Sequence, residues 1–292
     1  MTALTDAPRV APPAVLPPPE RPRPLRRRRR GSPATVLAGL VLGAAILAAV
    51  WPGLFTAADP LAGNAAAALQ APSAAHPFGT DATGRDLFAR VIYGAINSLS
   101  GALVAVTVGL LGGTLIGVLA GSIRGVVDDV LMRLVDVLLA VPALLLSLSI
   151  IIILGFGTVQ AAVAVGITSV AAFARLTRSE VVRNRHADYV EAAFASGGRF
   201  LPVLFRHVLP NSLTAVLALG AVQFGTAILA ISTLGFLGYG APPPTPEWGL
   251  LIAEGRNYIA TAWWLTLLPG LVVAAVVVSA GRVSAAIAEA GR

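Results

Sequence analysis

The sequence predicts an all-α membrane protein with six transmembrane helices. Hydrophobic residues make up 56% of the 292-residue chain and charged residues only 12%, against about 25% charged residues in a soluble domain. The apolar residues gather in runs of about 20, which is the length that a helix needs to cross a bilayer. Because the hydrocarbon core offers no partners for an open backbone, such runs are expected to be helices.

The six apolar segments are separated by polar or by glycine- and proline-rich stretches. Glycines recur through the second segment, where small residues let helices pack closely in a membrane. The fourth segment is short and rich in alanine and valine. The expected spans cover residues 34–56, 98–121, 134–154, 158–174, 212–236 and 262–281.

Residues 1–31 differ from the rest of the chain, because proline, alanine and arginine dominate them. This composition predicts a disordered tail. The run Arg26–Arg30 could indicate nucleic-acid binding, but it ends a few residues before the first apolar segment. That position favours an anchor at the cytoplasmic membrane face, with no nucleic-acid partner. Residues 32–292 then form the transmembrane domain.

Arginine placement predicts which side of the membrane each loop faces, because cytoplasmic loops carry an excess of basic residues. The two segments that join spans one to two and five to six hold three arginines together. The loop between spans four and five should therefore share the cytoplasmic side with the tail, so the span number is even and both termini are cytoplasmic. The arginines of that loop are Arg175, Arg178, Arg183, Arg185, Arg199 and Arg206.

The residue types that are missing exclude several chemistries. The chain has no cysteine, which excludes disulfides and thiolate sites. All 21 of its Lys and Arg residues are arginines, so it lacks the lysine of a P-loop or of a Schiff base. Its three histidines lie far apart in the sequence, outside the spans. We therefore expect no enzyme activity, no catalytic residue, no metal site and no cofactor in this chain.

The spans carry no charge at their centres, and Gln160 and Gln223 are their most polar side chains. An ion-gradient-driven transporter needs ionisable or coordinating groups near the midplane, so this class is a remote alternative. At the cytoplasmic start of the third span, Arg133 is expected to pair with Asp129 and Asp136 on one helix face.

Residues 188–210 form a polar, helix-forming island in a mostly apolar chain. Asp188 and Glu191 have the spacing of a capping box, with Asp188 as N-cap. A short amphipathic helix then stops at Gly197, because glycine adopts the left-handed conformation at little cost. A second amphipathic piece ends at Pro210. Such a unit suits docking into a groove of a cytosolic partner, and lying on lipid headgroups is the alternative.

The order of residues in this loop resembles the cytoplasmic signature of ABC-importer permeases. That signature reads Glu-Ala-Ala, three residues, Gly, nine residues, Ile, one residue, Leu-Pro. Glu191–Ala193, Gly197 and Leu209–Pro210 match it in identity and spacing. His207 replaces the isoleucine, as in the Arg-His-x-Leu-Pro-Asn ending of the peptide and nickel branch. Residues 76–100, 127–146 and 235–259 also resemble the C-type permease of the dipeptide/oligopeptide/nickel family.

The resemblance implies the type I ABC-importer permease fold and a permease subunit of an ATP-driven importer in the bacterial cytoplasmic membrane. Di- or oligopeptides are the expected cargo, and nickel chelates or glutathione are the alternatives. The implied partners are a second homologous permease subunit, two ABC ATPase subunits, an extracytoplasmic substrate-binding protein and membrane lipid. ATP and Mg would be bound by the ATPase subunits and not by this chain.

The resemblance also assigns the loop at about 188–210 as the coupling loop that docks on the ATPase. Glu191 is expected to pair with an ATPase arginine, and Gly197 to permit the sharp turn. The residues expected to couple to the ATPase are Asp188, Glu191, Ala192, Ala193, Phe194, Gly197, Arg206, Leu209 and Pro210.

Two external segments carry structural expectations. Thr83 and Asp86 have the spacing of a capping-box variant that would start a helix, and Asp81 and Arg85 are four residues apart. The proline-rich stretch at 242–246, followed by Trp248, predicts a rigid external turn. We expect Trp248 and Pro244 to contact the binding protein. One sequence does not identify the residues that line the substrate pathway.

Overall fold

The computed structural model describes residues 33–123 and 125–290, which form one compact unit. The expected tail, residues 1–31, lies outside the described residues. In the described part, helices account for nearly all regular structure, and the only β pairing is one isolated bridge between Thr80 and Asp86. The prediction of an all-α chain is confirmed.

Five helices of the described part are long and apolar enough to cross a membrane, and the number is six if one bent helix pair counts as a single span. Five expected spans therefore appear as single helices, although their bounds differ. The second expected span begins 11 residues earlier than predicted, because the amphipathic segment before it continues into the same helix. These helices are α1 (Pro33–Val50), α2 (Leu87–Ile123), α5 (Thr158–Arg185), α8 (Leu209–Phe236) and α10 (Trp264–Ala290).

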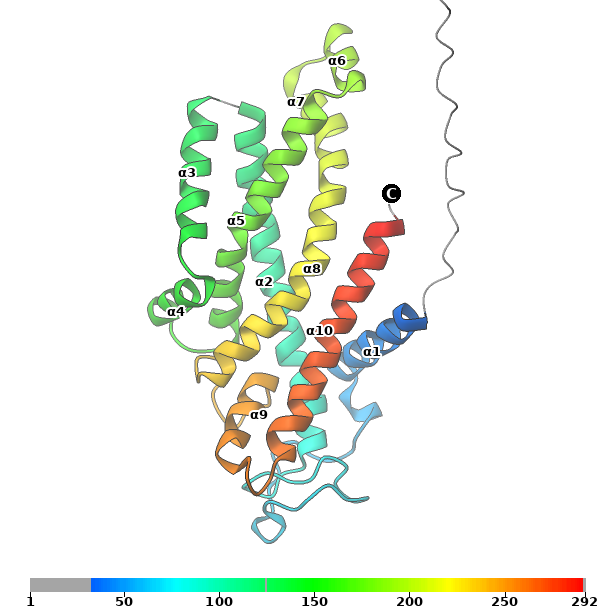
Figure 1. Cartoon of the computed structure of the whole chain (residues 1–292), viewed down its shortest axis with the longest axis vertical. Coiled ribbons are helices and arrows are strands. Elements are labelled where there is room, and N and C mark those ends of the chain that lie inside the picture. The colour runs from blue at the N-terminus through cyan, green and yellow to red at the C-terminus, as the bar shows by residue number, and fades with distance from the viewer. Residues whose placement is uncertain (1–32, 124, 291–292) are drawn as a thin grey trace, which may run out of the picture. The chain divides into compact units, whose positions relative to one another are not determined.

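The third expected span, predicted as one helix over residues 134–154, is wrong in shape. It consists of α3 (Val126–Ala140) and α4 (Ala143–Leu154), which meet at an angle of 97°. Pro142 lacks an N–H and disfavours helical backbone at the residue before it. Val141 accordingly has extended backbone angles, with φ −87° and ψ 129°. Both pieces pack against α5 (Figure 1).

Helices α2 and α5 lie side by side in very close contact (Figure 1). Three glycines of α2 leave no room for a side chain on this face. A Cβ atom added at Gly109, Gly113 or Gly117 would lie 2.8, 2.3 or 2.5 Å from the Cβ atom of an α5 residue. These glycines therefore serve packing, as their recurrence predicted. Helix α8 packs against both α2 and α5, and α10 packs against α8 and α1.

The short helices lie at the two ends of this bundle (Figure 1). At one end, α5 leads into α6 (Asp188–Ala195) and α7 (Phe200–Val203), and a π-helical turn over Leu204–Val208 joins α7 to α8. At the other end, α9 (Trp248–Gly255) lies between α8 and α10 in the sequence. Three 3-10 turns complete the described helices, at Pro52–Leu54, Ala65–Ala67 and Arg256–Tyr258.

Candidate coupling site and external cap

Helix α6 begins one residue earlier than the capping box predicted. Ala187 is the N-cap, with extended backbone, and its carbonyl accepts hydrogen bonds from the N–H groups of Val190 and Glu191. Asp188 is therefore the first helical residue, and no side chain caps the helix. The expectation of Asp188 as N-cap is wrong. Asp188 and Glu191 still stand in the first turn, where the helix dipole favours negative charge.

The stop at Gly197 is confirmed. Gly197 has φ +86°, in the left-handed region that favours glycine. Its N–H donates to the carbonyl of Phe194 at 2.9 Å, and the N–H of Gly198 donates to the carbonyl of Ala193 at 3.0 Å. These two bonds form a Schellman motif. The motif fixes the direction in which the chain leaves α6 and sets the angle between α6 and α7.

Pro210 does not end a helix, contrary to the sequence prediction. The chain stays helical from Phe200 to Phe236. In the π-helical turn before Pro210, the N–H of Leu209 donates five residues back, to the carbonyl of Leu204. This wider register accommodates a proline within the first turn of α8, where the missing N–H costs little. The amide of Asn211 donates to the carbonyl of His207 at 2.7 Å.

The coupling loop has a buried side and an exposed side. Val190, Val203, Leu204 and Val208 are buried and pack against Val181 of α5. This cluster fastens the loop to the bundle. On the exposed side Leu201 and Phe205 are 59% and 61% accessible. We call the exposed side chains Glu191, Ala192, Phe200, Leu201, Phe205 and Arg206 the coupling surface.

Most residues that the sequence assigned to ATPase coupling lie where a partner could contact them. Ala193, Phe194 and Leu209 are partly buried and support the loop from within. An exposed apolar surface with a basic rim at the end of a membrane bundle is a recognised feature of protein docking sites. The exposed members of the predicted set are Asp188, Glu191, Ala192, Gly197, Arg206 and Pro210.

Ion pairs between α3 and α5 replace the pairing that was predicted within the third span. Asp136 accepts a hydrogen bond from Arg175 at 2.5 Å, and Asp128 binds Arg178 through two bonds of 2.5 and 2.6 Å. The expected pairing of Asp136 with Arg133 is therefore wrong. The two arginines come from the adjacent helix, which a search along a single helix could not find.

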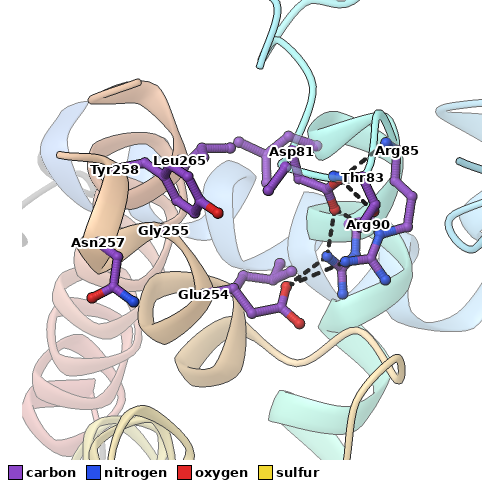
Figure 2. A pocket seen from close by; sticks show the side chains of 12 residues that line it. Asp81, Thr83, Arg85, Arg90, Glu254, Gly255, Asn257, Tyr258 and Leu265 are labelled. Atoms are coloured by element: carbon purple, nitrogen blue, oxygen red, sulfur yellow. Dashed lines mark hydrogen bonds and ion pairs between the residues drawn. The ribbon is translucent and has the colours of Figure 1, made fainter. Parts of the chain in front are cut away.

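The opposite end of the bundle carries a buried ionic cluster around Arg90, whose side chain is 0% accessible. Arg90 Nη1 donates to Asp81 Oδ2 at 2.7 Å and to Glu254 Oε2 at 2.6 Å, and Nη2 donates to the Pro244 carbonyl at 3.2 Å. Figure 2 shows this guanidinium between the two carboxylates. Arg85 and Asp81, four residues apart in the sequence, also form an ion pair, with an Nε–Oδ2 distance of 2.6 Å. The four charged side chains of the cluster line a cavity of about 290 Å³.

Asp86, and not Thr83, caps α2. Asp86 Oδ1 accepts from the N–H of Ala89 at 2.7 Å, whereas the hydroxyl of Thr83 donates to Asp81 at 2.8 Å. The expected capping box starting at Thr83 is wrong, because the Thr83 hydroxyl bonds to a carboxylate two residues before it and not to the helix. The structural role that was expected for this segment holds.

Trp248 is not available to another protein. Its side chain is only 1% accessible, and its indole N–H donates to the carbonyl of Val91 at 2.9 Å. The expected contact of Trp248 with a binding protein is therefore wrong, because its apolar ring is part of the core. Pro244 is exposed, and its contact with a binding protein stays a prediction. We call residues 242–254 the external cap, after the predicted orientation.

Glu247 is a buried structural carboxylate of the cap that the sequence did not reveal. It caps α9 by accepting from the N–H groups of Gly249 and Leu250, both at 2.9 Å, and from the hydroxyl of Ser98 at 3.2 Å. Burial raises the pKa of Glu247, although these hydrogen bonds oppose the shift. A polar residue directly before a short apolar helix was the available signal.

Replacing Glu247 by glutamine should flatten the pH dependence of stability. A raised folded-state pKa means that Glu247 favours folding most at low pH, and this contribution falls as pH rises above about 4.5, the unfolded value. The wild type should therefore lose stability relative to E247Q between pH 4.5 and 8, measured as thermal midpoints in detergent. Glutamine has one oxygen fewer, which adds a constant cost. E247A, which also removes the cap, should be less stable than E247Q by about 1 kcal/mol at every pH, because neither side chain titrates. A constant difference between wild type and E247Q would contradict the prediction.

A second cavity, of about 350 Å³, lies between α4, α5 and α8. No charged side chain is among the residues that line it. Thr168 and Thr233 donate their hydroxyl hydrogens to carbonyls of their own helices at 2.8 Å, which leaves oxygen lone pairs as acceptors. The polar lining residues are Ser147, Thr168, Thr226 and Thr233.

Residues 113–290 match the family model described as "Binding-protein-dependent transport system inner membrane component". The chain belongs to this family. The matched range includes Gly113 and Gly117 of the glycine contact, the whole coupling loop and the external cap. The permease is thus a multi-pass membrane component of a transport system that works with a binding protein.

Three curated relatives are similar to this permease over most of their length. The dipeptide transport system permease protein of Alkalihalophilus pseudofirmus is 39% identical over 82% of this chain and 78% of the relative. The probable D,D-dipeptide transport system permease protein of Escherichia coli is 37% identical over 84% and 82%. The glutathione transport system permease protein of Pectobacterium atrosepticum is 36% identical over 70% and 68%.

Solved structures confirm the type I permease fold. A chain of an amino acid ABC transporter crystallised with histidines superposes with a TM-score of 0.56 at 16% identity, and the match covers 70% of the permease and 95% of that chain. A chain of the methionine ABC transporter in an inward-facing conformation gives a TM-score of 0.53 at 16% identity, over 68% and 96%. At these identities the likeness concerns the fold alone.

Proposed function

We propose that this permease forms half of the translocation pathway of an ATP-driven importer of di- or oligopeptides in the bacterial cytoplasmic membrane. The observation that carries the proposal is the coupling surface. The buried valines of the coupling loop fasten this surface to α5 and α8, while Leu201 and Phe205 stay open for a partner. A rigid attachment on one side and an open apolar face on the other suit a loop that receives force.

The partners follow from the coupling surface and from the family. Two ABC ATPase subunits dock on the coupling surface of this chain and of a second homologous permease, and they bind the ATP and Mg. An extracytoplasmic binding protein delivers the cargo at the opposite face, and lipid surrounds the outer helices. The chain itself performs no catalysis. When the ATPases close, they move the coupling loop together with α5 and α8, as in hinge-type switching.

Relatives named for dipeptides support a peptide cargo, and the relative named for glutathione, itself a small peptide, supports the nearest alternative. The uncharged cavity agrees with either, because its hydroxyl oxygens can accept hydrogen bonds from amide N–H groups. Nickel chelates remain a further alternative within the same family. Specificity beyond this class depends on the binding protein.

The test is copurification of the tagged chain in mild detergent, with mass spectrometry of what accompanies it. We expect a second permease and P-loop ATPase chains. E191R should reduce the ATPase at least tenfold and leave the second permease bound, because losing a buried charge pair at an interface costs about 2–5 kcal/mol. G197P should have the same effect, because proline cannot adopt the φ of +86° at this position.

D59R is the matched control, because it makes a comparable charge change at an exposed residue away from the coupling loop. It should keep the ATPase bound. A chain that purifies without an ATPase and transports cargo without ATP would overturn the proposal and favour an ion-gradient-driven transporter.

A further inference from the structure

Helix α2 is bound by side chains at both ends of the bundle. Its 37 residues give a length of about 55 Å at 1.5 Å per residue, whereas the hydrocarbon core is about 30 Å thick. Both ends therefore extend beyond the hydrocarbon. Each end contacts a segment that faces a different partner in the proposed function.

At the cytoplasmic end, one arginine joins three elements. Arg185, the last residue of α5, donates from Nη1 to the carbonyl of Ser122 in the last turn of α2, at 2.5 Å. The same guanidinium lies 5.5 Å from the ring centre of Phe200, which belongs to the coupling surface. Val118 of α2 also packs against the buried valines of the coupling loop. A displacement of the coupling loop therefore acts directly on α2.

At the external end, α2 holds the cap by directional bonds. Asn97 Nδ2 donates to the Pro246 carbonyl at 2.7 Å, and the N–H of Trp248 donates to the hydroxyl of Ser98 at 3.1 Å. Arg90 of α2 also donates to Glu254 and to the Pro244 carbonyl of the cap. The indole N–H of Trp248 donates to the Val91 carbonyl of α2. The cap also packs on α8 and α10, but apolar contacts between helices allow the small sliding movements of shear motions.

Between its ends α2 is locked to α5 by the three close glycine contacts. Gly113 faces the Val170 carbonyl, which would lie 2.6 Å from a Cβ atom added at Gly113. Because the two backbones are this close, sliding one helix along the other would drive α5 side chains into the α2 backbone. The pair α2–α5 therefore moves as one body. The coupling loop lies at one end of this body and the external cap at the other.

We propose that α2 transmits movement between the coupling surface and the external cap, with Arg185 as the positioning residue at its cytoplasmic end. The inference rests on the proposed function, since it assigns the route by which ATPase and binding protein affect each other. Coupling of binding energies between two sites is reciprocal. A binding protein docked on the cap therefore acts back on the coupling surface through the same helix, and we expect to see this as stimulated ATP hydrolysis.

The test uses the complete transporter in proteoliposomes, with its liganded binding protein added at the external face. ATP hydrolysis is measured with and without the binding protein, together with cargo uptake per ATP. R185Q should reduce the stimulation by the binding protein at least fivefold and lower uptake per ATP. Hydrolysis without the binding protein and copurification of the ATPase should be unchanged. R185K should restore at least half of the stimulation, because lysine can still donate to the Ser122 carbonyl.

A second variant tests the same route from its other end. N97L removes the bond to the Pro246 carbonyl and should lose stimulation as R185Q does. The double variant R185Q/N97L should be no worse than either single variant, because both lie on one route. R183Q is the matched control: Arg183 lies two residues from Arg185, is 70% accessible and pairs with Glu180 of its own helix. It should behave as wild type.

Full stimulation in R185Q or in N97L would overturn the inference. A double variant R185Q/N97L that loses more stimulation than either single variant would also overturn it. Loss of the ATPase from R185Q would assign Arg185 to docking and also overturn it. Failure of the proposed function gives a different result, because the wild type itself would then show neither stimulation by a binding protein nor ATP-dependent uptake.

Discussion

Replacing Arg90 by methionine is expected to lower the free energy of unfolding by about 3–5 kcal/mol, the usual cost of removing one partner from a buried ion pair. Methionine fills much of the same space but removes one donor from each of two carboxylates, those of Asp81, which is 7% accessible, and Glu254. The Pro244 carbonyl also loses a donor. The measurement is the thermal or denaturant midpoint of the detergent-solubilised chain at pH 7.

The pH dependence of the Arg90 effect follows from Asp81. Burial alone would raise the pKa of Asp81, but hydrogen bonds from Arg85 and Thr83 outweigh it and lower the pKa below 3.8. A depressed folded-state pKa means that Asp81 contributes its full stability above pH 3.8 and loses it as the pH falls through the lowered value. The Arg90 effect should therefore be constant from pH 5 to pH 8.

R175M is the control for R90M. Arg175 and Asp136 also form an ion pair, but their side chains are 60% and 62% accessible. Exposed pairs of this kind contribute about 0–1 kcal/mol. Equal losses for R90M and R175M would show that the Arg90 cluster gains nothing from its burial and would contradict the prediction.

Replacing Gly113 by alanine is expected to destabilise the permease by about 1–3 kcal/mol or more, although alanine favours helices over glycine. The added methyl group would lie 2.3 Å from Phe173 Cβ, 2.6 Å from the Val170 carbonyl oxygen and 2.8 Å from the Ala174 nitrogen. Two of these atoms belong to the backbone of α5, so α5 has to move away as a whole. Thermal midpoint and cargo uptake should both fall.

G281A gives the matched comparison, because Gly281 also lies inside a long helix, α10. No described atom lies within 4 Å of a Cβ atom added there. Alanine should therefore stabilise the permease at this position by up to about 1 kcal/mol. The two substitutions are thus expected to have opposite signs. A stabilising G113A would mean that α2 and α5 do not pack as closely as described.

The spans and the coupling loop were accessible from the sequence because their signals are local. An apolar run predicts a helix through its length alone, and Gly197 was found because a left-handed stop needs glycine at a fixed place. The N-cap of α6 was misplaced by one residue. Aspartate is favoured at N-cap positions, but in this helix the extended backbone of Ala187 makes that residue the N-cap. The bend at Pro142 was missed since both flanking pieces are equally apolar.

The external cluster was inaccessible for a different reason. Glu254 lies 164 residues from Arg90 in the sequence, and no periodicity links the two. The burial of Trp248 likewise depends on where α9 packs, which a proline-rich stretch does not reveal. Electrostatic pairs between helices, such as Arg178 with Asp128, follow from packing and can be predicted only after the helices are placed.

The bend between α3 and α4 decides what can surround that flank of the permease. The last carbonyls of α3 and the first N–H groups of α4 fall outside any helical hydrogen-bond pattern, and the nearby cavity is lined by Ser147 and by threonines. Open peptide groups cannot be solvated by acyl chains. This flank therefore requires water or another protein against it, so a permease left alone in a bilayer would draw water to the bend.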